Sequence, residues 1–307
     1  MGRYDITRRI ERLDPERDHQ QIVHYLVGWE FPWDYIRALE MALYRTYCVP
    51  RTSRVLDQTR EFHERPQRRY DDTALLMAEI MEWGYDSERG REALRRVNRF
   101  HRYYDIDNKD FLYVLTTFHR EPLRWIDAYG WRRLTERERL ASYHFWREVG
   151  KRMNIRDIPP TMEAFEAWSV EHERTEFGYD DANRRIAEST RELFANWFPR
   201  PVRPLVRLGI RAMLDDAMLT SFGFEPAPRA VQSTVALALR LRGRALRLFP
   251  SRARKGFITG KRNRSWPNGY QLSQLGPPPL LERRDDAIHG ASTNGCPFSA
   301  PRVPSST

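Results

Sequence analysis

Residues 69–101 read RYDDTALLMAEIMEWGYDSERGREALRRVNRFH, and two helical patterns within them decide the expected fold. Apolar residues in each pattern recur at steps of three and four, the spacing that places side chains on one face of a helix. A turn with Gly84 and Gly90 separates the patterns, and helices joined by a short turn usually pack antiparallel. The second helix carries a stripe made of Leu94, Val97, His101 and Tyr104.

The first helix of this hairpin begins with a cation and a hydroxyl on its apolar face. Arg69 and Thr73 are four residues apart, so they share a face with the apolar residues that follow them. Antiparallel packing of the two helices is expected to bring Arg69 and Thr73 close to His101. The three side chains would then meet at one end of a buried groove.

Two interpretations of this group remain open on spacing alone. A neutral imidazole in an apolar pocket, faced by a cation and a hydroxyl, is a suitable ligand set for a haem iron. A single histidine on an apolar stripe is, however, more often a hydrogen-bonded core residue. Arg69 ends the basic run that starts at Arg65 and would equally suit a solvated helix start, and Thr73 would equally bond its own backbone.

Several short motifs together resemble a known family. They are Arg69-x-x-x-Thr73, the run Arg95–His101, Phe111–Leu115, and Phe145–Gly150 followed by Ile158–Thr161. From about residue 20 to Pro204 the chain resembles the family that contains latex-clearing protein (rubber oxygenase) and the endoplasmic-reticulum-bound oxygenase of mycophenolic acid biosynthesis. At one position it departs, because rubber oxygenase has a lysine directly before the threonine and this chain has Asp72.

The resemblance implies an all-α, single-domain helical bundle around a buried haem pocket. In the family, the histidine at the place of His101 is the proximal ligand of a b-type haem. The arginine and threonine matching Arg69 and Thr73 lie near the open, distal side, so we expect them to line it, or Arg69 to bind a haem propionate. The implied activity is a haem-dependent oxygenation, with dioxygen, of a hydrophobic substrate that contains an alkene or resembles a lipid.

Composition supports a large helical body with a basic C-terminal third. The 307 residues are 40% hydrophobic and include 9 Trp, 14 Tyr and 15 Phe, enough to fill a sizeable core. The net charge is +10, but residues 200–307 hold 18 basic and 6 acidic side chains, so the body is nearly neutral. We therefore divide the chain into a helical catalytic region (1–228), a basic amphipathic helix (229–250), and a largely disordered tail (251–307) that is basic and then rich in proline and glycine.

The basic helix, expected over Ala230–Phe249, has two interpretations. Arg240, Arg244 and Arg247 share one face, which would suit peripheral contact with an anionic membrane. The same pattern would suit a surface helix that covers the bundle, with arginines extended into solvent. No signal peptide or apolar run of roughly 20 residues is seen, so we expect a cytoplasmic protein, with or without membrane contact.

Other features add local expectations. Pro122 predicts a kink or break near Phe118, and Thr135 with Glu138 predicts a capping box. His119 is a second candidate ligand or pocket residue, although its charged neighbours favour a partly exposed position. Four further histidines stand in charged or disordered contexts and are expected to be solvated: His19, His63, His172 and His289.

Most other classes of site lack their signatures. There is no H-E-x-x-H, G-x-S-x-G, phosphate-binding glycine loop or dinucleotide fingerprint, and two cysteines cannot build a zinc site. No C-x-x-C-H occurs, so any haem would be held non-covalently. The alternatives to an oxygenase are a helical scaffold without cofactor and a nucleic-acid-binding protein; the nearly neutral body disfavours the latter.

Overall fold

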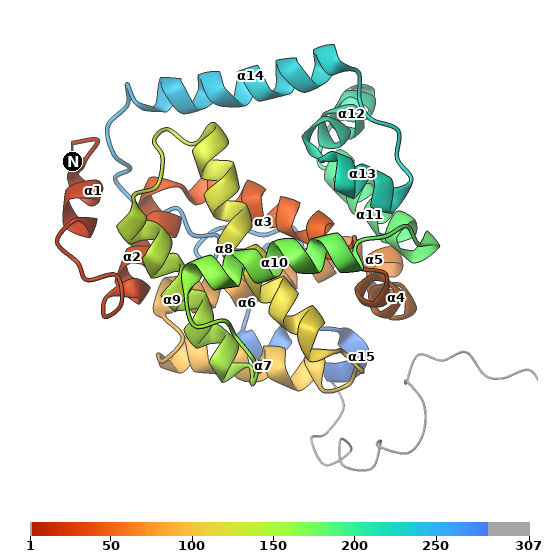
Figure 1. Ribbon diagram of the computed structural model, residues 1–307, viewed down its shortest axis with the longest axis horizontal. Helices are drawn as coiled ribbons and strands as arrows, with labels where there is room; N and C mark the ends of the chain where they lie inside the picture. The colour runs from red at the N-terminus through yellow and green to blue at the C-terminus, as the bar shows by residue number, and fades with distance from the viewer. Residues whose placement is uncertain (1, 282–307) are drawn as a thin grey trace, which may run out of the picture.

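The computed structural model describes residues 2–281, and within that range the chain is helical and contains no β-strand (Figure 1). This confirms the all-α prediction. The α-helices are α1 (Asp5–Ile10), α2 (His19–Tyr25), α3 (Pro32–Thr46), α4 (Pro50–Gln58), α5 (Glu61–Glu64), α6 (Pro66–Trp83), α7 (Glu88–His101), α8 (Asn108–Tyr129), α9 (Glu136–Arg152), α10 (Met162–Glu176), α11 (Asp181–Ala195), α12 (Arg203–Met213), α13 (Asp216–Phe222), α14 (Arg229–Leu246) and α15 (Pro278–Leu281). One π-helical turn, η1 (Leu26–Glu30), and two 3-10 turns, η2 (Arg200–Val202) and η3 (Leu272–Gln274), complete the helical elements.

The predicted hairpin is present as α6 and α7, and its two glycines explain how closely the helices approach. Gly84 ends α6 with a φ of +82°, a left-handed value that favours glycine. Ser87 starts α7, because its Oγ accepts a hydrogen bond of 3.0 Å from the Gly90 N–H. A Cβ on Gly90 would lie 1.9 Å from the carbonyl oxygen of Gly84, so any side chain there would force the turn apart.

The helices α3 and α8 pack along each other at the centre of the bundle, and α9 and α10 pack against α8 (Figure 1). Of the kink or break predicted near Phe118, the break is wrong, because α8 continues through Pro122. Contacts with four neighbouring helices, α3, α9, α10 and α14, hold α8 together although Pro122 cannot donate its backbone hydrogen bond. The capping box of α9 is confirmed: Thr135 accepts from the Glu138 N–H, and Glu138 accepts from the Thr135 N–H.

A buried arginine fixes the end of α3. Arg45 is 3% exposed, and its guanidinium lies 2.8 Å from Glu121 of α8, 3.1 Å from Glu173 of α10 and 2.5 Å from Asp215. A buried cation is tolerated only when carboxylates surround it in this way. The cluster therefore holds α3, α8 and α10 in a fixed relation beside the cavity described below.

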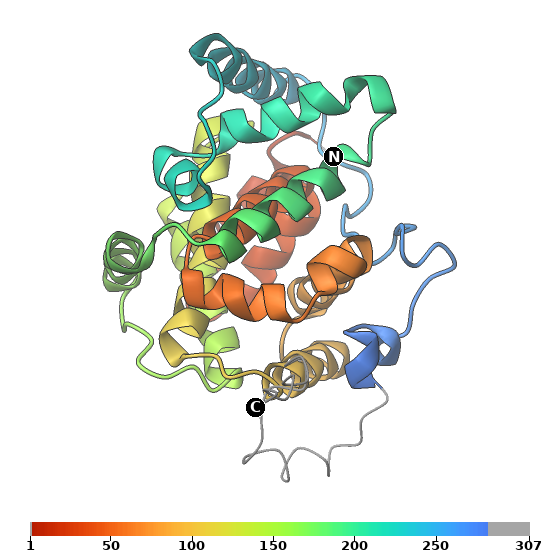
Figure 2. The ribbon, with the colours of Figure 1, turned by 90° about the vertical axis from the view of Figure 1, so that its right-hand side faces the viewer.

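The C-terminal part of the described chain covers the bundle on two sides (Figures 1 and 2). The helix α14 lies across α12 and α8. Its Arg242 turns inward, 2.9 Å from Asp34, with the guanidinium 3.6 Å from the centre of the Trp33 ring. The helix is thus attached to the body, while Arg240 and Arg244 stay exposed.

Residues 251–281, here called the strap, follow α14 and lie along α6 and α7 (Figure 2). The sequence predicted a largely disordered tail from residue 251, and over 251–281 the structure differs from that expectation. Phe257, Leu275 and Leu280 of the strap are buried. Carboxylates on α6 accept hydrogen bonds from strap residues; the pairs are Asp71 with Ser265, Asp72 with Trp266, Glu79 with Tyr270 and Glu82 with Thr259. The rest of the predicted tail, 282–307, lies outside the described residues.

Candidate functional site

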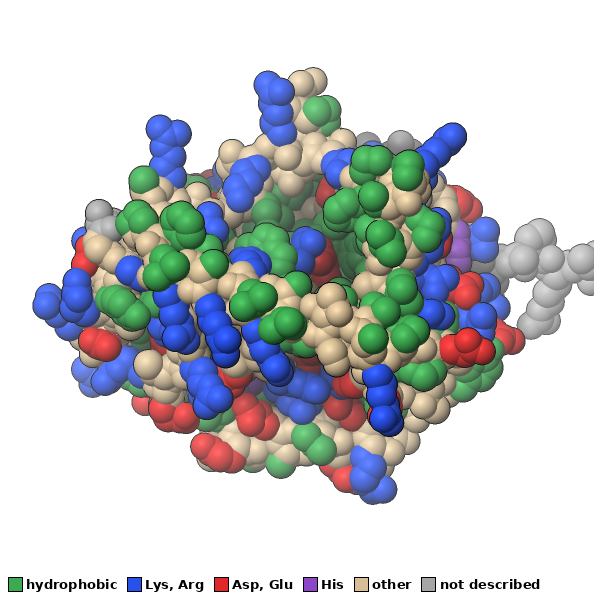
Figure 3. Space-filling view, turned by 90° about the horizontal axis from the view of Figure 1, so that it is seen from above, with side chains coloured by type: hydrophobic (Ala, Val, Ile, Leu, Met, Phe, Trp, Pro, Cys, Tyr) green, Lys and Arg blue, Asp and Glu red, His purple; other side chains and the backbone are tan. Residues whose placement is uncertain are grey.

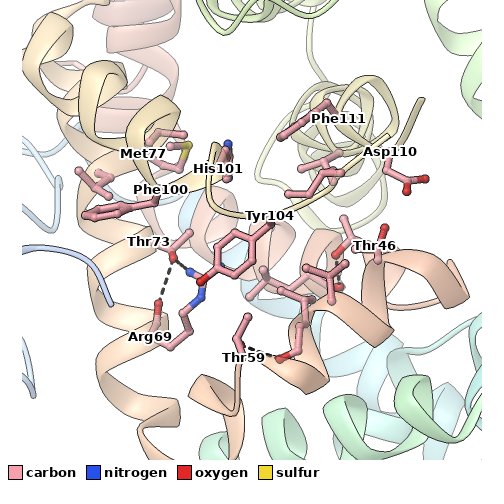
Figure 4. Close-up of a pocket in the computed structure, with 18 of the residues that line it drawn as sticks. Thr46, Thr59, Arg69, Thr73, Met77, Phe100, His101, Tyr104, Asp110 and Phe111 are labelled. Atoms are coloured by element: carbon pink, nitrogen blue, oxygen red, sulfur yellow. Dashed lines mark hydrogen bonds between the residues drawn. The ribbon is translucent and has the colours of Figure 1, made fainter. Parts of the chain in front are cut away.

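A cavity of about 480 Å³ lies inside the bundle, between the α6–α7 hairpin and α3, α4 and α8 (Figure 4). This volume is within the range of small-molecule and cofactor sites. Its walls are mostly apolar and include Leu43, Val55, Val114 and Trp146. Such walls favour a hydrophobic occupant and exclude water from the polar groups among them.

His101, the last residue of α7, borders this cavity. The His101 side chain is partly buried, its ring centre lies 5.1 Å from that of Phe111, and its Nδ1 is buried without a hydrogen-bond partner. Burial, and secondarily the positive charge of Arg69, lowers the pKa of His101 to about 4, so the imidazole is neutral at neutral pH. A neutral imidazole at the wall of a mostly apolar cavity has a ring-nitrogen lone pair that a ligand could use.

Arg69 and Thr73 lie on α6, on the same side of the cavity (Figure 4). The Arg69 guanidinium donates a hydrogen bond to Thr73 Oγ1, which in turn donates to the Arg69 carbonyl oxygen at 3.0 Å. The guanidinium also lies 5.4 Å from the centre of the Phe62 ring. Within residues 2–281 it makes no ion pair, so its charge is free to meet an anionic group.

The structure therefore brings His101, Arg69 and Thr73 to one cavity, as the helical spacing predicted. Val97 and Tyr104 of the predicted stripe line it too. Thr73 also donates a hydrogen bond to the backbone of its own helix, which was one of the two alternatives for this residue. It lines the cavity all the same. The roles of the three residues stay predictions.

The sequence did not predict one wall of this cavity. Gly276, Pro277 and Pro278 of the strap line the cavity, although the proline-rich run was interpreted as disorder. Asp72 holds this wall in place: its carboxylate accepts a hydrogen bond of 3.0 Å from the Gly276 N–H and one of 2.7 Å from the Trp266 Nε1–H. Burial raises the pKa of Asp72. In this chain, Asp72 stands at the position where rubber oxygenase has a lysine, and it holds the strap against α6.

Several histidine predictions need correction. His119 is fully buried but does not line the cavity; its Nδ1 is 3.0 Å from Ser142 Oγ, and its Nε2 is 3.5 Å from Glu166. It is thus neither a pocket residue nor a partly exposed one. His19 and His172 are also buried, whereas His63 is partly exposed and lies 2.7 Å from Asp57. His289 lies outside the described residues.

These features define a class of protein: a helical bundle that encloses a hydrophobic cavity containing a neutral, unpartnered imidazole and an unpaired arginine. Among residues 2–281 no group of three or more His, Cys, Asp or Glu side chains is arranged to hold a metal ion. A metal carried by a prosthetic group needs only one protein ligand.

The chain matches, over residues 29–247, the family described as the catalytic domain of the ER-bound oxygenase mpaB/B' and rubber oxygenase. It belongs to this family, as the sequence motifs indicated. The family consists of oxygenases, which act on a substrate and dioxygen, so the chain is assigned to the oxidoreductases.

Three proteins to which the chain is similar are fungal. The chain is 31% identical to the ER-bound oxygenase mpaB of Penicillium roqueforti over 62% of its own length and 70% of the relative's. It is 28% identical to the ER-bound oxygenase mpaB' of Penicillium brevicompactum over 88% of its own length and 64% of the relative's. To mpaB of P. brevicompactum it is 31% identical, over 56% of its own length and 49% of the relative's.

Proposed function

We propose that this protein is a b-haem-dependent oxygenase of a hydrophobic, lipid-like or alkene-containing substrate, with His101 as the protein ligand to the haem iron. The observation that carries the proposal is the neutral imidazole of His101 at the wall of a mostly apolar cavity of about 480 Å³. A neutral imidazole has the lone pair that iron requires, and the pKa of about 4 keeps it neutral. The residues present therefore fit a haem.

When bound, the haem supplies the activation of dioxygen, and the protein supplies binding, orientation and a dry site. His101 would donate a ring-nitrogen lone pair from the end of α7. Arg69, held by its hydrogen bond to Thr73, would keep a positive charge at the cavity for a haem propionate or another anionic group. The apolar walls would hold the hydrophobic substrate within the same cavity and exclude water from it.

The test is a titration of the purified protein with haem, followed by its absorption spectrum and iron content. We expect one haem per chain and an intense violet absorption band. Replacing Arg69 with alanine should lower the haem affinity about tenfold, because a charge-assisted hydrogen bond in a low-dielectric site is lost. Arg95→Ala is the matched control, since Arg95 is exposed on α7 and paired with Glu92.

A protein that binds no haem would refute the proposal and favour the scaffold or the nucleic-acid-binding alternative. Equal haem affinities of the Arg69→Ala and Arg95→Ala variants would show that Arg69 does not contribute to haem binding. Its remaining role would then be in binding the substrate.

We also propose that the protein contacts an anionic membrane from the face formed by η2, α12 and α14. No helix of residues 2–281 is long and apolar enough to span a bilayer. On this face, Leu205, Leu237 and Leu241 are 69%, 54% and 50% exposed, and arginines stand among the apolar side chains (Figure 3). Such a mixture suits the interface of an anionic bilayer. The fungal relatives are named as ER-bound, which supports the proposal.

The vesicle test replaces Arg240 and Arg244 with glutamine together. Each arginine near an anionic surface contributes about 1 kcal/mol, so binding to phosphatidylserine-containing vesicles should fall at least tenfold. Sedimentation with vesicles measures it, with Arg95→Gln as the single-charge control and duplex DNA in a parallel assay. Tight DNA binding with no vesicle binding would contradict the membrane proposal.

A further inference from the structure

A second cavity, of about 300 Å³, adjoins the first on the other side of Arg69. Its walls come from α3, α6, Trp197 and strap residues 256–264. Several side chains line both cavities, among them Leu43, Met77 and Phe118 together with the Arg69–Thr73 pair. One layer of side chains thus separates the two spaces.

The second cavity carries an excess of unpaired positive charge. Four arginines line it: Arg37, Arg69, Arg262 and Arg264. Only Arg37 has a carboxylate partner, Glu40, at 2.6 Å. Among residues 2–281 the other three make no ion pair, and Arg264 instead lies 5.7 Å from the centre of the Trp197 ring.

The carboxylates of this cavity are already satisfied. Glu40 accepts a hydrogen bond of 2.7 Å from the Tyr70 hydroxyl as well as that from Arg37, and burial raises its pKa to about 7. Asp71 accepts hydrogen bonds of 2.9 and 2.7 Å from the backbone N–H and the hydroxyl of Ser265. Neither carboxylate pairs with Arg262 or Arg264, so the charges of these two arginines remain available to an anionic group.

Charge and apolar surface are separated along the cavity. Arg262 and Arg264 are exposed, so they mark its solvent side. Elsewhere the walls are mostly apolar, and their residues Ala78, Met81 and Phe257 are buried. This arrangement matches an amphiphile that enters with its apolar end first and leaves an anionic end at the mouth.

We propose that the second cavity binds a long-chain carboxylic acid, with its carboxylate at Arg262 and Arg264 and its chain directed toward the first cavity past Met77. The proposal deepens the proposed function, because it names the substrate class that would present its chain to the haem pocket. Only that last step rests on the oxygenase activity; binding of the acid does not.

The test compares cis-parinaric acid, a long-chain acid that fluoresces in apolar surroundings, with its methyl ester, which has the same chain without the charge. We expect the acid to bind the full-length protein about tenfold more tightly than the ester. The double variant Arg262→Gln with Arg264→Gln should remove this preference by weakening the acid alone. Arg240→Gln with Arg244→Gln is the matched control, since it removes two exposed arginines that line neither cavity.

A filling variant tests the location. Ala74 lines the second cavity but not the first, and Ala74→Phe should weaken both ligands at least tenfold while circular dichroism shows an intact fold. Equal binding of acid and ester, or equal effects of the two double variants, would overturn the proposal, and so would a folded Ala74→Phe protein that binds both ligands normally. The measurement involves no turnover, so a failure of the haem proposal would appear separately, in the absorption spectrum.

Discussion

Replacing His101 with alanine is expected to give a protein that folds and no longer retains haem. The side chain contacts the Phe111 ring and has a buried Nδ1 without a partner, so its loss removes little native hydrogen bonding. Destabilisation of about 1 kcal/mol or less is therefore expected in the haem-free protein. Haem occupancy should fall severely, because the described part of the cavity offers no second histidine.

Haem content after gel filtration, together with a thermal unfolding curve, measures both effects. His144→Ala is the matched control: His144 is a partly exposed histidine outside the cavity, and its loss should leave haem content unchanged. In a His101→Gly protein, added imidazole should restore part of the haem spectrum, because the space left by the side chain can admit a free imidazole ligand. Full haem occupancy in His101→Ala would contradict the assignment of His101 as the ligand.

The site could be predicted from the sequence where local spacing controls it. Arg69, Thr73 and His101 lie on two helices whose faces follow from helical periodicity, and Gly84 and Gly90 marked the turn that pairs those helices. Spacing alone left two interpretations of His101, a ligand or a core histidine. The family resemblance favoured the interpretation as a haem ligand.

The burial of His119 follows from helical spacing, although its charged neighbours favour exposure. Its neighbours Arg120 and Glu121 are charged, which favoured an exposed position. Leu115, His119 and Leu123 are nevertheless spaced at four residues, and all three are buried. Helical spacing therefore predicts which face of a helix a residue occupies better than the polarity of its direct neighbours does. Consecutive side chains on a helix point in different directions.

The strap could not be predicted in this way, because its order is tertiary. Basic, glycine-rich and proline-rich segments have no helical or strand periodicity, and their composition alone resembles that of disordered chains. What orders residues 251–281 is a row of hydrogen-bond acceptors on α6, such as Asp71 and Asp72, and the burial of Leu275. These partners lie about two hundred positions earlier in the chain, so no local pattern reveals them.

Replacing Leu275 with alanine is expected to destabilise the protein by about 3 kcal/mol, because Leu275 is fully buried and the substitution leaves a void. The strap at this point is held by Arg96, which donates to the carbonyl oxygens of Ser273 and Leu275 at 2.7 and 2.8 Å. Loosening it moves the next residues, Gly276–Pro278, which form a wall of the cavity. Haem should therefore dissociate faster, as measured by its transfer to an excess of an acceptor protein.

Leu272→Ala provides the matched control for this variant. Leu272 belongs to the same strap and is only partly buried, so its truncation should cost about 1 kcal/mol and leave the cavity wall in place. Urea unfolding of both variants separates the stability effect from the haem effect. A Leu275→Ala protein that unfolds at the same urea concentration as Leu272→Ala would show that the strap contributes little.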